Sequence, residues 1–93
     1  MKTIFTNDEF RKLIVEKVAA VIHDGALYDV DAEHEDFDGN ICLSFYCDFD
    51  DYFYAFPWDN IKSITYHETT NTFVIVAEGE KDFKCRLLTE LKV

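Results

Sequence analysis

The chain has few of the residues that interrupt regular structure: only three Gly and one Pro among 93 residues. This scarcity excludes a collagen-like or linker-like chain. No apolar run approaches the length of a membrane span, and the N-terminal segment becomes acidic before a signal-type apolar core develops. We therefore expect a cytoplasmic protein that makes no use of a membrane.

Cysteine is also scarce, and its three positions do not form a motif. An odd number without the Cys-x-x-Cys spacing excludes a disulfide framework and a zinc knuckle. Cys42 and Cys47 are five residues apart in one predicted strand, so they face opposite sides of it. We interpret Cys47 and Cys85 as small core residues, and reduced thiols fit a cytoplasmic compartment.

Motifs for catalysis or cofactor binding are missing. Three scattered glycines cannot form a phosphate-binding loop. The segment Asp36–Asn40 fails the calcium-loop pattern, because Gly39 comes too early and Cys47 stands where the final Glu belongs. None of the histidines has a partner at metal-ligand spacing: His23, His34 and His67. We expect no enzymatic activity, no cofactor and no metal site; a weak divalent site among the acids near Asp36 or Asp50 is the less favoured alternative.

What the chain has in quantity is apolar and aromatic residues, at 48% and 16% of its length. This content is too high for a disordered chain, even with a net charge of −10. Ninety-three residues allow one small domain, so we expect residues 1–93 to form a single acidic α+β domain.

One helix is predicted over residues 7–23. Thr6 and Glu9 fit a capping box at its start. An apolar stripe follows at helical spacing: Phe10, Leu13, Ile14, Val18, Val21 and Ile22. Gly25 is expected to end the helix, because glycine adopts the left-handed C-terminal conformation at little cost.

The rest of the chain alternates apolar and polar residues with the period of two that is typical of strands. Asp38-Gly39-Asn40 is a tight-hairpin signal, and Pro57 ends an aromatic strand because it cannot donate to a central ladder. Strands are expected at 28–33, 41–49, 52–56, 64–68, 73–77 and 83–87. The short links favour antiparallel hairpins, so the sequence predicts an α+β fold: a single N-terminal helix packed on an antiparallel sheet of five or six strands.

Such a sheet has two faces, and one helix cannot cover both. Either the sheet curls strongly or its second face is partly exposed. In the second case, exposed aromatic residues would mark a partner or dimer surface, and the candidates are Tyr46, Tyr52, Tyr54 and Trp58. The alternative is that these aromatic side chains fill a small core.

Positive charge is absent from the middle of the chain, because no Lys or Arg occurs between Val18 and Ile61. Residues 24–59 hold eleven of the 19 acids, whereas the other eight acids accompany all nine bases. Ordinary surfaces intersperse the two signs, since self-repulsion destabilises the compact state. The whole excess of negative charge therefore belongs to this segment.

We hypothesise that these acids form a docking surface on the hairpin region. On a regular strand, alternate residues project from one face about 7 Å apart. A row of fixed anions presents a field like that of a nucleic-acid backbone, which attracts grooves lined with Lys and Arg. The expected partner-binding residues are Asp29, Asp31, Glu33, Glu35, Asp36, Asp48, Asp50 and Asp51, with Tyr46, Tyr52 and Trp58 as apolar anchors.

The favoured hypothesis is a non-enzymatic inhibitor that mimics nucleic acid and blocks the basic cleft of a nucleic-acid-processing protein. Phage-encoded anti-restriction and anti-CRISPR antagonists are analogous in size and acidity. The expected partner is a basic, nucleic-acid-binding protein, while the sign of the charge disfavours direct contact with nucleic acid. The alternative is a protein–protein interaction module that uses its aromatic sheet face, such as a toxin-immunity partner or a homodimeric accessory protein. A solvated acidic face that only aids solubility is the remaining interpretation.

Overall fold

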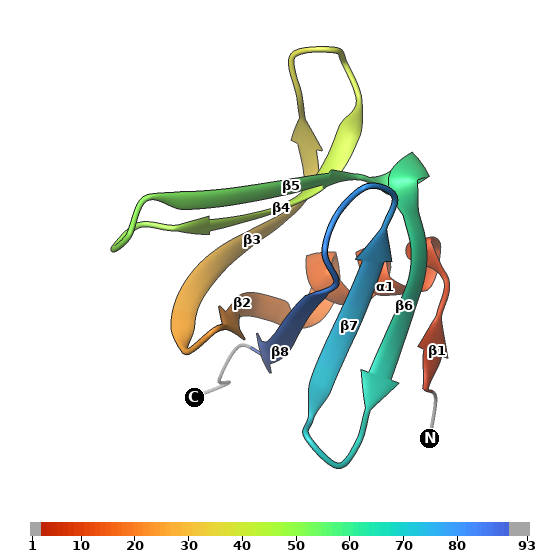
Figure 1. The fold of residues 1–93 in the computed structure, drawn as a ribbon, viewed down its shortest axis with the longest axis vertical. Helices are drawn as coiled ribbons and strands as arrows, with labels where there is room; N and C mark the ends of the chain where they lie inside the picture. Colours follow the sequence, from red (N-terminus) through yellow and green to blue (C-terminus); the bar gives the residue numbers. More distant parts are fainter. Residues whose placement is uncertain (1–2, 90–93) are drawn as a thin grey trace.

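The computed structural model describes residues 3–89, which fold into one α-helix, one short 3-10 turn and eight strands (Figure 1). The helix is α1 (Asn7–Lys17), and the 3-10 turn is η1 (Trp58–Asn60). The strands are β1 (Ile4–Phe5), β2 (Val18–His23), β3 (Ala26–Glu35), β4 (Ile41–Cys47), β5 (Tyr52–Pro57), β6 (Ile61–His67), β7 (Thr72–Ala77) and β8 (Phe83–Thr89).

All neighbouring strands pair antiparallel, in the order β1-β6-β7-β8-β2-β3-β4-β5. A helix packed on an antiparallel sheet was predicted, and this part of the prediction is confirmed. The expected number of five or six strands is wrong, because the sheet has eight. The two strands missed by the sequence analysis are β1, which has only two residues, and β2, which lies within the predicted helix.

The helix begins as predicted and ends earlier. The Thr6 hydroxyl accepts the N–H of Glu9 at 3.1 Å, and the Glu9 carboxylate accepts the N–H of Thr6 at 2.9 Å. The helix ends at Lys17 instead of residue 23, and Val18 is already extended. Within residues 3–89, no helix combines the length and apolar character needed to cross a membrane.

Residues 18–23 form β2 because they have strand partners on both sides. Val21 pairs with Tyr28 of β3 and with Leu87 of β8, and its side chain is fully buried. A short apolar run that is buried on a sheet matches a helical stripe by chance, so periodicity alone misassigned it. Gly25 then belongs to a two-residue hairpin turn with Asp24, in which φ is positive at both residues, 48° and 76°.

The sheet curls strongly, as the chain connection from β5 to β6 requires. Five strands lie between β5 and β6 in the sheet order. In a flat sheet, the six spacings of about 4.8 Å would therefore separate β5 from β6 by about 29 Å. The three residues of η1 bridge at most about 14 Å. The end of β5 therefore lies close to the start of β6, and Figure 1 shows η1 at this corner.

The core fills the concave side of the curled sheet. Phe83 stacks on Phe45 with ring centroids 4.5 Å apart, which joins β8 to β4 across the interior. Helix α1 lies behind the sheet in Figure 1 and contributes Phe10, which is fully buried against Phe73 at 5.2 Å. The outer face of β3, β4 and β5 has no helix against it, so this region carries the candidate surface.

Candidate functional site

Strand β3 contains a β-bulge that the sequence analysis did not predict. Asp31 pairs with Ser44 and His34 pairs with Cys42, so three steps along β3 match two steps along β4. The Asp31 carboxylate accepts the backbone N–H of Glu33 at 2.9 Å inside this bulge. One extra residue reverses the face on which the following side chains lie.

The predicted row of four acids on one face of β3 is therefore wrong. Asp29 and Asp31 lie on the outer face, away from the core, whereas the bulge turns Glu33 and Glu35 to the other side of the strand. On that side, the Glu33 carboxylate lies 4.0 Å from the guanidinium of Arg11 in α1. The acids of β3 thus separate into two groups.

One group gathers around the turn between β4 and β5. Asp29, Asp48 and Asp50 line a hollow of about 510 Å³ together with Tyr46 and other residues. The Tyr46 hydroxyl donates to Oδ1 of Asp51 at 3.2 Å. This hydrogen bond, followed by the charge of Asp51, raises the pKa of Tyr46 above its ordinary value. We name this group, made of Asp29, Asp48, Asp50 and Asp51, the acidic end.

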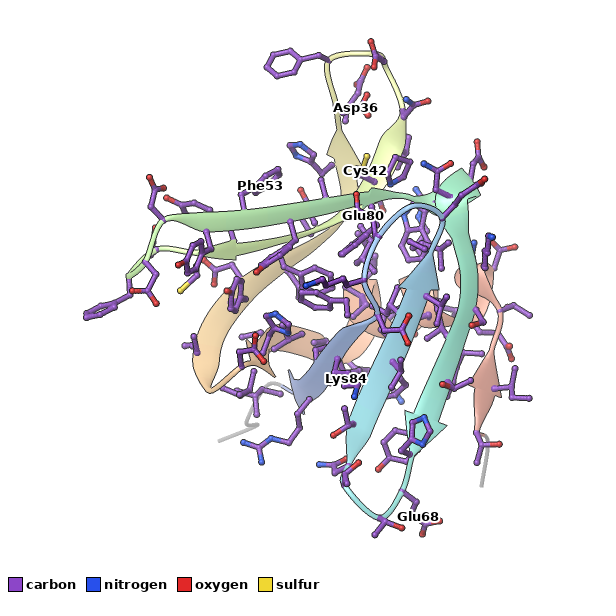
Figure 2. The ribbon with its side chains drawn as sticks, in the orientation of Figure 1. Asp36, Cys42, Phe53, Glu68, Glu80 and Lys84 are labelled. Carbon is purple, nitrogen blue, oxygen red and sulfur yellow. The ribbon has the colours of Figure 1, made fainter. Side chains whose placement is uncertain are left out.

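The other group lies at the turn between β3 and β4, where Asp36 organises the backbone. Its Oδ1 accepts the N–H groups of Asp38 and Asn40, each at 2.9 Å, and the Cys42 thiol donates to Oδ2 at 3.7 Å (Figure 2). These hydrogen bonds, with the Asn40 backbone first, hold the pKa of Asp36 below its ordinary value. We therefore assign Asp36 to turn stability instead of the docking surface in which it was expected.

Both turns carry the same tripeptide, Asp-Phe-Asp, at residues 36–38 and 48–50. The next residue has a positive φ in each case, 82° at Gly39 and 56° at Asp51. The central Phe37 and Phe49 are 110% and 95% exposed, so neither contributes to the core. The sequence analysis predicted the turn at Asp38-Gly39-Asn40, but it placed Phe49 in a strand and did not use the repeated tripeptide.

The expected aromatic anchors divide into exposed and buried residues. Tyr46 and Tyr52 are exposed, and Phe53, which was not among the predicted anchors, is exposed beside them. Trp58 is only 8% exposed, and its indole N–H donates to the Ala32 carbonyl at 2.8 Å. The expectation of an exposed anchor at Trp58 is therefore wrong, because this side chain is buried and links η1 to β3 through its hydrogen bond.

No protein-family model matches the chain, and neither a curated protein nor a solved structure is significantly similar to it. The functional argument therefore depends on the surface itself. Within the described part of the chain, no group of three His, Cys, Asp or Glu side chains is arranged to hold a metal ion.

Within residues 3–89, no Lys or Arg forms an ion pair with the acidic end. Among residues 3–89, Arg11 pairs with Glu33 at the other side of β3 and the His23 ring lies 3.4 Å from Asp24, and neither of these acids belongs to the acidic end. The acids of the turn, Asp48, Asp50 and Asp51, are all exposed. An uncompensated cluster on a short turn projects a negative field that attracts a positively charged surface.

Proposed function

We propose that this protein is a non-enzymatic binding protein whose acidic end docks into the basic, nucleic-acid-binding cleft of a partner. The observation that supports this proposal most is the gathering of four carboxylates around exposed aromatic side chains, with no Lys or Arg in ion-pair contact among the described residues. Clefts that take phosphates are lined with Lys and Arg and attract such a surface. Anti-restriction and anti-CRISPR antagonists exemplify this class of function.

The exposed aromatic side chains supply the apolar part of the interface. Phe49 stands between Asp48 and Asp50 at the tip of its turn, and Tyr46 and Tyr52 flank the same end of the β4–β5 hairpin. Aromatic residues near the centre of an interface carry much of its affinity, whereas charge complementarity speeds association and fixes orientation. The matching surface is an apolar pocket with a rim of Lys and Arg.

We also propose that the protein resides in the reducing cytoplasm. Cys42, Cys47 and Cys85 are buried free thiols. Burial raises the pKa of Cys85 to about 12, so this thiol carries almost no reactive thiolate at neutral pH. Unpaired, buried cysteines support a compartment in which disulfides do not form.

A second candidate function is a protein–protein interaction module that uses the outer aromatic face. Tyr46 of β4 pairs directly with Phe53 of β5, and both side chains are exposed on the same face of the sheet. Such a face would bind a neutral partner or a second copy of the chain with little dependence on salt.

The test of the proposed function is capture of binding proteins from a lysate of the native host at low and moderate salt. The bait is the wild-type chain or a variant with the acidic turn neutralised, Asp48→Asn, Asp50→Asn and Asp51→Asn. A nucleic-acid-binding protein is expected on the wild-type bait, released by moderate salt and by added DNA or RNA, and at least tenfold less of it on the variant.

The matched control removes three acids elsewhere, at the exposed positions Glu16, Glu68 and Glu78, by substitution with Gln. It has the same net charge as the acidic-turn variant, so it separates the location of the acids from their number. Equal capture by the two variants, or retention that does not respond to salt, would contradict the proposed function.

A further inference from the structure

The curled sheet ends in two edge strands that differ in length and protection. β1 has two residues, whereas β5 has six. Natural proteins protect edges by shortness, Lys or Pro, because unpaired backbone N–H and C=O groups recruit another strand. β5 has no Lys, and its Pro57 stands at the last position. β5 is therefore the unprotected edge of the sheet.

Strand β5 borders a groove of about 620 Å³ that has an aromatic wall and a charged wall. Tyr54 and Phe56 of β5 line it, and Phe83 lies 5.2 Å and 5.4 Å from their rings. His23 stacks on Phe83 at 4.0 Å. The loop 79–82 lines the opposite side, and Figure 2 shows Glu80 on it, facing β5, with Lys84 on β8 below. A groove of this size beside an unprotected edge suits an added peptide strand.

Charge decides which occupant fits this groove. Two copies of the chain would each carry a net charge of −10, and pairing their β5 strands would bring acid against acid. The lining itself contains three acids and two bases. More acids lie at the ends of β5, in the turn before it and in η1 after it: Asp48, Asp50, Asp51 and Asp59. A basic segment is therefore favoured over a second copy.

We propose that β5 and its groove bind an extended segment of a partner protein in which Lys or Arg alternates with apolar residues. The segment adds to the sheet beside β5, its backbone hydrogen-bonds to the free edge, and its apolar side chains pack on the aromatic wall formed by Tyr54, Phe56 and Phe83. The Lys and Arg side chains reach the acids around β5. This inference rests on the proposed function, since it concerns the same basic partner, and it adds the way in which that partner docks.

The test uses the full chain and a synthetic peptide in which Lys alternates with Val, with binding measured by calorimetry at low salt. In an extended strand, the N–H groups of alternate residues point to opposite edges. Two further peptides, N-methylated on every Lys or on every Val, therefore each lose the donors of one edge but keep the same charge. We expect one methylated peptide to bind at least tenfold more weakly than the parent, and the other to bind like the parent.

Every other pattern overturns the inference. Equal binding of all three peptides would show attraction by charge alone, which leaves the proposed function standing. Loss of binding by both methylated peptides would not fit an added strand with one paired edge. No binding of the parent peptide would also overturn the inference. Failure of the proposed function is recognised separately, by the capture experiment with the two triple variants.

Hydrogen exchange on the same complex shows whether β5 gains a neighbour. We expect alternate backbone amides among Tyr52–Phe56 to exchange at least tenfold more slowly when the parent peptide is bound. The amides of Ile4–Phe5 on the other edge serve as the internal control and should not change. Unchanged exchange throughout β5 would overturn the inference even if the peptide binds.

Discussion

Phe83 occupies the position where the two halves of the curled sheet approach each other. It stacks on Phe45 and His23 and contacts Tyr54 and Phe56 at ring distances between 4.0 and 5.4 Å. One side chain of β8 thus contacts the neighbouring strand β2 and, because the sheet curls, also β4 and β5. Its neighbourhood forms both the core and the wall of the groove beside β5.

Replacement of Phe83 by Ala should lower the free energy of unfolding by about 3–5 kcal/mol, because a large buried ring is lost and a cavity remains. Urea denaturation followed by circular dichroism measures this change. Phe49→Ala is the matched control, since Phe49 is 95% exposed and its loss should change stability by less than about 0.5 kcal/mol. Similar effects of the two substitutions would contradict the assignment of Phe83 to the core.

The Asp36 carboxylate should make stability depend on pH. Its folded-state pKa lies below the ordinary value of 3.8, so its ionised form stabilises the fold above that pH. The contribution is lost as pH falls through the folded pKa. We expect Asp36→Ala to unfold at lower urea concentration than wild type at pH 7, and the difference to shrink below about pH 4.

The contrary result for Asp36 would be a difference between variant and wild type that stays constant between pH 7 and pH 3. Asp38→Ala is the control in the same turn, because no side-chain hydrogen bond of Asp38 is found among the described residues. The Asp38→Ala variant should lose stability toward urea at acid pH in the same way as wild type.

Gly39 tests the geometry of the turn that Asp36 organises. Its φ of 82° is left-handed, and a Cβ at this position would meet only Glu35 Oε1, at 4.0 Å. Gly39→Ala should therefore cost about 1–2 kcal/mol through backbone strain alone, without a clash. Thermal or urea denaturation measures the loss, and a neutral effect would contradict the left-handed assignment.

At the scale of elements, the signals that the sequence predicted correctly are local. The capping box and the hairpin turn at Gly39 each depend on a few adjacent residues, and both occur where expected. β2 could not be predicted in this way, because Val21 becomes part of a strand only through partners in β3 and β8. The bulge in β3 could not be predicted for the same reason, since it is defined by the pairing register of β3 with β4.

The candidate site shows the same limit. The exposure of Tyr46 and Tyr52 agrees with the sequence-based expectation, whereas Trp58 is buried in the core and donates a hydrogen bond to Ala32, a residue far away in the sequence. The separation of Glu33 from Asp29 follows from one extra residue in a strand. Charge counts along a chain therefore predict that an acidic surface exists more reliably than they predict which acids share it.

Thr6 provides a test at the start of α1. Thr6→Ala removes the acceptor for the Glu9 N–H and should reduce stability by about 1 kcal/mol. The control is Thr69→Ala, an exposed threonine in the turn between β6 and β7, which should have little effect. Equal stability of the two variants would contradict the contribution of the cap.

At the scale of the whole molecule, the acidic end and the groove beside β5 are connected through one hairpin, because the turn 48–51 leads directly into β5. Figure 1 shows this turn projecting away from the helix and away from the turn between β3 and β4. One hairpin thus presents the acids, the exposed aromatic residues and the unprotected edge to a single partner.

The net charge predicts the association state of the chain. At −10, two copies repel each other, so sedimentation velocity at low salt should show a monomer. A tight dimer that persists at low salt and is disrupted by Phe53→Lys would contradict this prediction. It would favour the interaction module that uses the outer aromatic face.

The central claim is that the acidic end occupies a cleft that otherwise holds nucleic acid. The most direct measurement is displacement of labelled nucleic acid from the captured partner by wild type, by the Asp48, Asp50 and Asp51 variant, and by the Glu16, Glu68 and Glu78 control. We predict that wild type and the control displace the nucleic acid at similar concentrations, and that the acidic-turn variant needs at least ten times more. Simultaneous binding of protein and nucleic acid to the partner, or equal displacement by all three chains, would contradict the account.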